Sequence, residues 1–138
     1  MKFSLEHDFS AYAIRAYRPG QISITLPARL DADTPQPVAV ETLSTSLIIS
    51  PRQLFRDWPL QDISALCSER ILELVNFDPE VVLLGTGQQL EFPSPELLAE
   101  LYRRRIGVEV MDTAAACRTY NILMNEGRHV VAGLINQA

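Results

Sequence analysis

Residues 81–133 read VVLLGTGQQLEFPSPELLAELYRRRIGVEVMDTAAACRTYNILMNEGRHVVAG, and this stretch decides the fold. Apolar runs at 81–84 and 108–111 each lead into a segment with helical spacing, and a third run at 129–135 closes the stretch. Short, continuous apolar runs of this kind predict strands that are buried on both faces. Strands that alternate with helices favour a parallel or mixed sheet with helices on its faces.

Two of the predicted helices begin at residues that suit a helix start. In Ser94-Pro95-Glu96, serine caps, proline fits the first position and glutamate complements the positive end of the helix dipole. Asp112 is a good N-cap for a second helix, which is predicted to run to Glu126 and to stop at Gly127. With a buried strand at 47–49 and a helix at 68–75, the order from residue 47 becomes β-α-β-α-β-α-β.

The N-terminal third is predicted to be rich in β structure. Residues 12–17 and 22–26 alternate between apolar and polar, and Pro19 and Gly20 between them suit a type II turn. A loop is expected at 31–37, a short strand at 38–40, and an irregular segment at 52–59. Trp58, in that segment, is expected at the edge of the core.

The composition narrows the range of functions. A chain of 138 residues, 47% of them hydrophobic, can form a single domain with its own core. Its net charge of −5 repels a nucleic-acid backbone, and the basic run 103–105 is too short to reverse that, so we expect no nucleic-acid partner. No apolar run approaches the roughly 20 residues that span a bilayer, and no signal peptide is recognisable, so we expect a cytoplasmic protein without membrane insertion.

The residues that usually carry catalysis are scarce. Cys67 and Cys117 lie in no C-x-x-C pattern, and two buried thiols are preferred over a disulfide, although the two could still be neighbours in space. His7 and His129 are too few and too far apart for a zinc site, so no metal and no cofactor are predicted. Cys117 is preferred as a core residue over a nucleophile, and the catalytic residues, if any, are unknown.

A ligand is most readily expected where the strands end, because open α/β sheets bind ligands beyond the carboxyl ends of their strands. If the strands at 81–84 and 108–111 are parallel, the loop 85–89 and Asp112–Thr113 share one edge of the sheet. Backbone N–H groups, a threonine hydroxyl and a helix N-terminus there suit a small anion. Gly-Thr-Gly by itself is a weak signal, and a turn with positive φ is the preferred explanation for its glycines.

The helix that follows Asp112 carries Thr119-Tyr120-Asn121, three mediocre helix formers, so packing or polar contacts must explain them. Arg118 and Asn121 lie about one turn apart and are placed on one rim. Tyr120 is preferred as a half-buried anchor over a catalytic acid. The candidate ligand-binding residues are therefore Gly85, Thr86, Gly87, Gln88, Asp112, Thr113, Arg118, Tyr120 and Asn121.

The runs GTG, EVMDTAAACRTYN and EGRHVVAGL resemble the Mth-nine-three-eight-like domain family, which is domain of unknown function four-nine-eight. The resemblance reaches from about residue 47 to 134, and Gly133 stands where the family often has an alanine. It implies a single three-layer α/β domain over residues 1–138, with a mixed, mostly parallel central sheet and a small N-terminal β layer. The family includes a mitochondrial complex I assembly factor, and it supplies no agreed catalytic residues.

Two functions follow as hypotheses. The first is a non-enzymatic interaction or assembly protein, which rests on the missing catalytic motifs and on analogy with the assembly factor. A protein partner and a weak homodimer are compatible with this hypothesis. The second is a small-molecule site, with or without catalysis, at the edge formed by 85–89 and Asp112–Thr113. A pocket at that edge would favour the second hypothesis, and an exposed apolar patch would favour the first.

Overall fold

The computed structural model describes residues 10–28 and 38–138, so the loop expected at 31–37 lies outside the described residues. Within them the chain forms a three-stranded antiparallel sheet and a five-stranded mixed sheet, of strand order β1-β2-β3 and β5-β4-β8-β6-β7. The small sheet contains β1 (Ala13–Arg18), β2 (Gln21–Thr25) and β3 (Val40–Leu43). The central sheet contains β4 (Leu47–Ile49), β5 (Leu54–Phe55), β6 (Val81–Gly85), β7 (Gly107–Met111) and β8 (Val130–Leu134).

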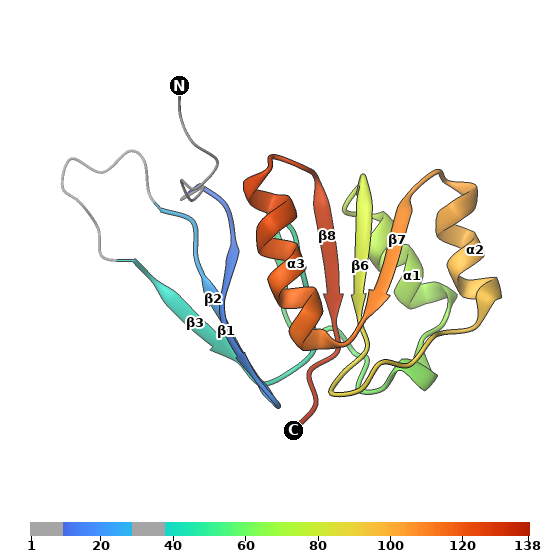
Figure 1. Cartoon of the computed structure of the whole chain (residues 1–138), viewed down its shortest axis with the longest axis horizontal. Coiled ribbons are helices and arrows are strands. Elements are labelled where there is room, and N and C mark those ends of the chain that lie inside the picture. Colours follow the sequence, from blue (N-terminus) through green and yellow to red (C-terminus); the bar gives the residue numbers. More distant parts are fainter. Residues whose placement is uncertain (1–9, 29–37) are drawn as a thin grey trace.

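The helices are α1 (Ser68–Val75), α2 (Pro95–Arg103) and α3 (Thr113–Asn125), and a short 3-10 helix, η1, spans Ile63–Ala65. Figure 1 shows α3 between the small sheet and the central sheet, with α1 and α2 on the opposite face of the central sheet. The predicted three-layer α/β fold with an N-terminal β layer is therefore confirmed.

Alternation along the central strands decides which layer each side chain joins. Leu47 and Ile49 pack with α3 and the small sheet, whereas Ile48 between them packs with α1 and α2. Val81 and Leu83 of β6 likewise face α3, and the alternate residues of β6 face the other way. Because β4, β6 and β8 are buried along their whole length, their apolar runs are continuous.

The parallel part of the sheet is β8-β6-β7, because β6 pairs in parallel with both neighbours. Strand β4 pairs antiparallel with β8 and with β5. The segment 52–59, expected to be irregular, contains the two residues of β5, which fold back onto β4. Two residues are too few to produce an alternation that could be recognised in the sequence.

Several boundaries and faces differ from the expectation. The third strand lies at Val40–Leu43 rather than at 38–40. Gly20 has a φ of 84°, as the predicted type II turn requires, and the pairing of β1 with β2 is irregular between Ile14 and Ala16. Helical spacing predicts an apolar stripe of Leu97, Leu98, Leu101 and Tyr102. Tyr102 is nevertheless 57% exposed, because Leu101 occupies the position that faces the core.

The polar residues in the middle of α3 hold the small sheet. The Tyr120 side chain is fully buried rather than half-buried, and its hydroxyl donates to the Tyr12 carbonyl at 2.7 Å. The Asn121 side chain accepts from the Ile14 N–H at 2.9 Å and donates to the Ile14 carbonyl at 2.7 Å. These bonds explain why Tyr120 and Asn121, which are mediocre helix formers, occur in the middle of α3.

Asn121→Ala is expected to lower the free energy of unfolding by about 1–3 kcal/mol, because it leaves both backbone groups of Ile14 without their partner. Denaturant unfolding measures this loss, and amide hydrogen exchange at Ile14 should become faster. The control is Ile122→Ala, which changes an exposed neighbour on the same helix. Equal effects of the two substitutions would show that Asn121 does not tie the layers together.

Candidate functional site

The loops after β6 and β7 lie together, because the two strands are parallel and Gly85 pairs in register with Met111. The Thr86 N–H donates to the Met111 carbonyl at 2.9 Å, and the Thr113 N–H donates to the Gly87 carbonyl at 2.9 Å. The arrangement predicted for Gly85, Thr86, Gly87, Asp112 and Thr113 is thus present at the carboxyl edge of the parallel strands.

Thr113 joins three segments at this edge. Its side chain is fully buried, and its hydroxyl donates to the Ile135 carbonyl at 2.7 Å and accepts from the Gly87 N–H at 2.8 Å. A Cβ on Gly85 would lie 3.0 Å from that hydroxyl oxygen, so glycine is needed here for close approach rather than for positive φ. The crevice between β6 and β7 is therefore occupied by the protein's own groups.

Asp112 and Gln88, which lie near the crevice, also bond within the chain. The Asp112 carboxylate accepts from the Ala115 N–H at 2.8 Å, which confirms the predicted N-cap. The Gln88 N–H donates to the Gln137 side-chain oxygen at 3.2 Å, and the Gln88 amide donates to the Ala138 carbonyl at 2.8 Å. Gly87 has a φ of 107° and faces Gln137, so the turn with positive φ expected for Gly-Thr-Gly is found here.

Thr86 organises the loop that leads to α2. It is buried, donates its hydroxyl proton to the Gln89 carbonyl at 2.6 Å and accepts from the Glu91 N–H at 3.1 Å. Pro93, near the other end of the loop, is buried as well. Between these two anchors, Leu90 and Phe92 are 52% and 70% exposed. A loop fixed from inside thus presents two large apolar side chains to the solvent.

Arg118, Tyr120 and Asn121 lie apart from this edge. They are five to eight residues into α3, which at a rise of about 1.5 Å per residue places them roughly 8–12 Å from Thr113 along the helix. Arg118 and Asn121 do share one rim, which borders a cavity of about 340 Å³ between α3 and β1. Tyr17 lies in the same cavity wall, and partial burial, followed by the effects of Cys117 and Asp112, raises its pKa.

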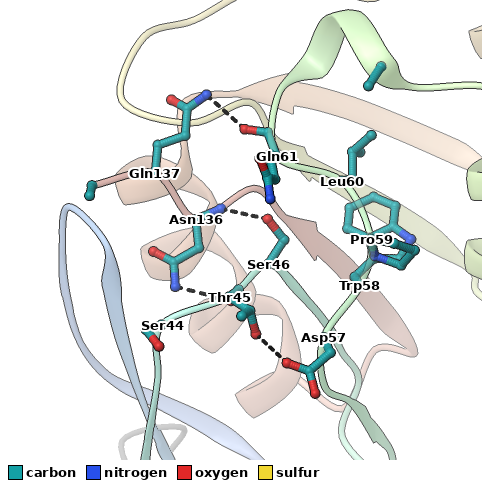
Figure 2. A pocket seen from close by; sticks show the side chains of 12 residues that line it. Ser44, Thr45, Ser46, Asp57, Trp58, Pro59, Leu60, Gln61, Asn136 and Gln137 are labelled. Carbon is teal, nitrogen blue, oxygen red and sulfur yellow. Dashed lines mark hydrogen bonds between the residues drawn. The ribbon is translucent and has the colours of Figure 1, made fainter.

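A larger cavity, which no motif in the sequence indicates, lies at the same edge of the sheet beside β4 and β8. Its volume is about 740 Å³. Figure 2 shows Gln137 bonded to the Gln61 carbonyl and Thr45 bonded to Asp57 in its wall. Asp57 has a φ of 58°, an unusual conformation for a residue other than glycine. The lining residues are Ser44, Thr45, Ser46, Asp57, Trp58, Pro59, Leu60, Gln61, Ala65, Asn136, Gln137 and Ala138.

This cavity is assembled from three separate segments, namely 44–46, 57–65 and 136–138. No single motif could reveal it, although the Trp58-Pro59 pair and the polar run 44–46 were visible in the sequence. Its wall meets the predicted loop through Gln137, which bonds both Gln88 and Gln61. The cavity and the predicted loop are therefore neighbours on one edge.

The cysteines are unpaired, and only one of them is buried. Cys67 is exposed, which corrects the expectation of two buried thiols: it precedes the first turn of α1 and lies outside the apolar face of that helix. Burial raises the pKa of the Cys117 thiol to about 12, so it stays protonated at neutral pH and is a poor nucleophile. Within residues 10–28 and 38–138, no group of three or more His, Cys, Asp and Glu side chains is placed to hold a metal ion.

The helices in the described part of the chain are too short or too polar to span a membrane.

One relative, from Francisella tularensis, carries the name 13 kDa major membrane protein and is 31% identical over 61% of this chain and 69% of its own length. NADH dehydrogenase [ubiquinone] 1 alpha subcomplex assembly factor 3 from Danio rerio is 50% identical over 41% of this chain. That match spans 32% of the assembly factor, so about two thirds of the relative has no counterpart in the alignment.

Solved structures of similar proteins cover nearly the whole fold. A Bordetella parapertussis protein has a TM-score of 0.77 and 31% identity, over 93% of this chain and 98% of that one. A Bordetella pertussis protein described as a Mth938-like domain has a TM-score of 0.73 and 26% identity, over 100% and 95% of the two chains. The family model for Protein of unknown function (DUF498/DUF598) matches residues 14–135, and the chain belongs to that family.

Proposed function

We propose that this chain is a non-enzymatic assembly factor, which binds a protein partner through Leu90 and Phe92 on the loop between β6 and α2. The observation that carries the proposal is the exposure of these two side chains on a loop whose backbone Thr86 holds from inside. The relationship to an assembly factor supports the same kind of role.

The geometry suits binding because the loop has its shape before a partner arrives. Large apolar side chains on a preorganised loop lose little conformational freedom on association, so more of the gain from their burial appears as affinity. Aromatic residues that fill a partner's pocket are frequent centres of binding energy. The expected partner therefore offers an apolar pocket that accepts the Phe92 ring.

Phe92→Ala is expected to weaken binding of the partner by about 30-fold or more, which corresponds to roughly 2 kcal/mol. The partner would first be captured with the intact protein from an extract of its native cells, and its affinity then measured by calorimetry. Leu90→Ala should weaken binding in the same direction. Ile122→Ala is the matched control, because Ile122 is similarly exposed but lies on α3.

Thr86→Val tests the role assigned to the loop conformation. It should weaken binding without removing either apolar side chain, because the Gln89 carbonyl and the Glu91 N–H lose their shared partner. Unchanged affinity in Phe92→Ala, or an equal loss in Ile122→Ala, would remove this loop as the binding surface. The cytoplasmic location and the weak homodimer expected from the sequence stay predictions.

A small-molecule site at the same edge is the second candidate, supported by the cavity of about 740 Å³ beside the predicted loops. The predicted loops would then border the cavity through the bond of Gln88 to Gln137 rather than line it. These loops contain the candidate residues Gly85, Thr86, Gly87, Gln88, Asp112 and Thr113. Arg118, Tyr120 and Asn121 would take no part. Screening of small neutral polar compounds by NMR, read at Gln61 and Gln137, distinguishes this candidate from protein binding.

A further inference from the structure

The opposite edge of the central sheet, where β8 starts, carries a concentration of positive charge. A cavity of about 360 Å³ lies there, lined by Pro51, Arg52, Met124, Gly127, Arg128 and His129. Three of these six residues are basic, none is acidic, and the chain as a whole has a net charge of −5. A basic cavity on an acidic protein is a local departure from the overall field, and it attracts anions.

The backbone on both sides of this cavity is held firmly. On one side Ser50 and Gln53 close the turn that carries Arg52, with the Ser50 N–H donating to the Gln53 carbonyl at 2.9 Å and the Gln53 N–H donating to the Ser50 hydroxyl at 3.1 Å. The Tyr12 N–H also donates to the Pro51 carbonyl at 3.0 Å. Arg52 therefore extends from a fixed position.

On the other side, the end of α3 forms a Schellman motif. The Gly127 N–H donates to the Met124 carbonyl at 3.0 Å, and the Arg128 N–H donates to the Leu123 carbonyl at 3.1 Å. Gly127 has the positive φ, 82°, that this motif requires. Arg128 and His129 thus leave a fixed turn toward the same cavity as Arg52.

The arginines are poorly neutralised by the protein itself. Within the described residues, Arg52 is exposed and makes no ion pair, and Arg128 reaches Glu80 only at 3.9 Å. The Glu80 carboxylate also accepts from the His129 N–H at 3.2 Å, so the Glu80 side chain lies beside the cavity. Guanidinium groups from two turns repel each other, and an anion between them would remove the repulsion.

We propose that this cavity binds a phosphate group, held between Arg52 and Arg128 with His129 as a third donor. Arginine forks match phosphate oxygens in pairs, and a phosphate offers more charge and more acceptor oxygens than a carboxylate does. The phosphate belongs either to a small soluble phosphate ester or to a lipid headgroup. Glu80 competes for Arg128, because it is the carboxylate that already approaches this side chain.

The test titrates the full chain with inorganic phosphate and follows the backbone amide signals of residues 52–53 and 127–130. Saturable shifts confined to these two turns are expected. Arg52→Gln and Arg128→Gln should each weaken binding about tenfold, since each removes a charge-assisted contact. Glu80→Gln should strengthen binding, because it removes the competing charge and keeps an acceptor for the His129 N–H. Arg104→Gln, at the end of α2, is the control and should change nothing.

Arg104→Gln changes the net charge by the same amount as Arg52→Gln, so unchanged binding by Arg104→Gln excludes a general effect of charge. Thermal melting of each variant checks the fold. Cosedimentation with vesicles of phosphatidylcholine containing phosphatidic acid separates the two sources. Binding to vesicles that is lost in Arg52→Gln assigns a lipid headgroup, and binding to free phosphate alone assigns a soluble ester. Absence of saturable shifts with phosphate, or equal binding by Arg52→Gln and the intact protein, overturns the proposal.

Discussion

Trp58→Ala is expected to lower the free energy of unfolding by about 3–5 kcal/mol, the range typical of removing a large buried aromatic side chain. Trp58 is only 2% exposed, and its indole N–H donates to the Glu73 carboxylate at 2.8 Å. The ring packs over Gly133 of β8, where an added Cβ would lie 2.9 Å from the ring. The substitution therefore opens a cavity and leaves the Glu73 carboxylate without this donor.

Gly133→Ala provides the matched test of the same contact from the other side. The added methyl group overpacks against Trp58 and Leu74, so a loss of about 1–3 kcal/mol is expected. Combining Gly133→Ala with Trp58→Phe should cost less than the sum of the two single losses, because the smaller ring makes room for the methyl group. Denaturant unfolding of the four proteins measures this coupling, and strict additivity would show that Gly133 and Trp58 are not fitted to each other.

Thr113→Val should lower the free energy of unfolding by about 2–4 kcal/mol, because two buried backbone groups would lose their partner. The Gly87 N–H and the Ile135 carbonyl both bond the Thr113 hydroxyl, and valine keeps the shape without the oxygen. The expected result includes faster amide exchange at Gly87, which hydrogen-exchange NMR would detect.

Thr113→Ser is the control for this prediction, because serine keeps the hydroxyl and removes only a methyl group. Its expected loss is about 1 kcal/mol, the usual cost of a buried methyl group. If serine and valine prove equally destabilising at this position, packing rather than hydrogen bonding decides the role of Thr113.

The sequence was sufficient to predict the central layer, because each deciding signal is local. Residues 81–84 are apolar at every position, and Asp112 and Gly127 mark the ends of one helix by their capping chemistry. The parallel pairing of β6 and β7 followed from the helix between them. The same reasoning correctly placed Gly87 and Thr113 on one edge.

The sequence could not predict whether the polar groups at that edge bond a ligand or the protein itself, because this depends on contacts between residues distant in the chain. Gln137 reaches Gln88 across 49 residues, and Asn121 reaches Ile14 across 107. Nothing in the sequence around Gln137 or Asn121 shows whether the side-chain amide bonds within the chain or to a ligand. Helical spacing puts Arg118 and Asn121 on one rim, but the rise of about 1.5 Å per residue separates both of them from Thr113 along the helix axis. A shared rim therefore does not place these two side chains at the loops.

The position of α3 between two sheets has a consequence for how the molecule opens. Among the described helices and strands, α3 is the element that β1 packs against, and Tyr120 and Asn121 bond to Tyr12 and Ile14 near the start of the chain. Strand β3 has further ties, from Glu41 to Arg56 and from the Leu43 carbonyl to Asn136. We therefore expect the N-terminal hairpin to open at a lower free-energy cost than β6 and β8, which are buried along their whole length. Such an opening would bare the apolar underside of α3 before global unfolding, which makes that surface the first to become accessible to chaperones and proteases.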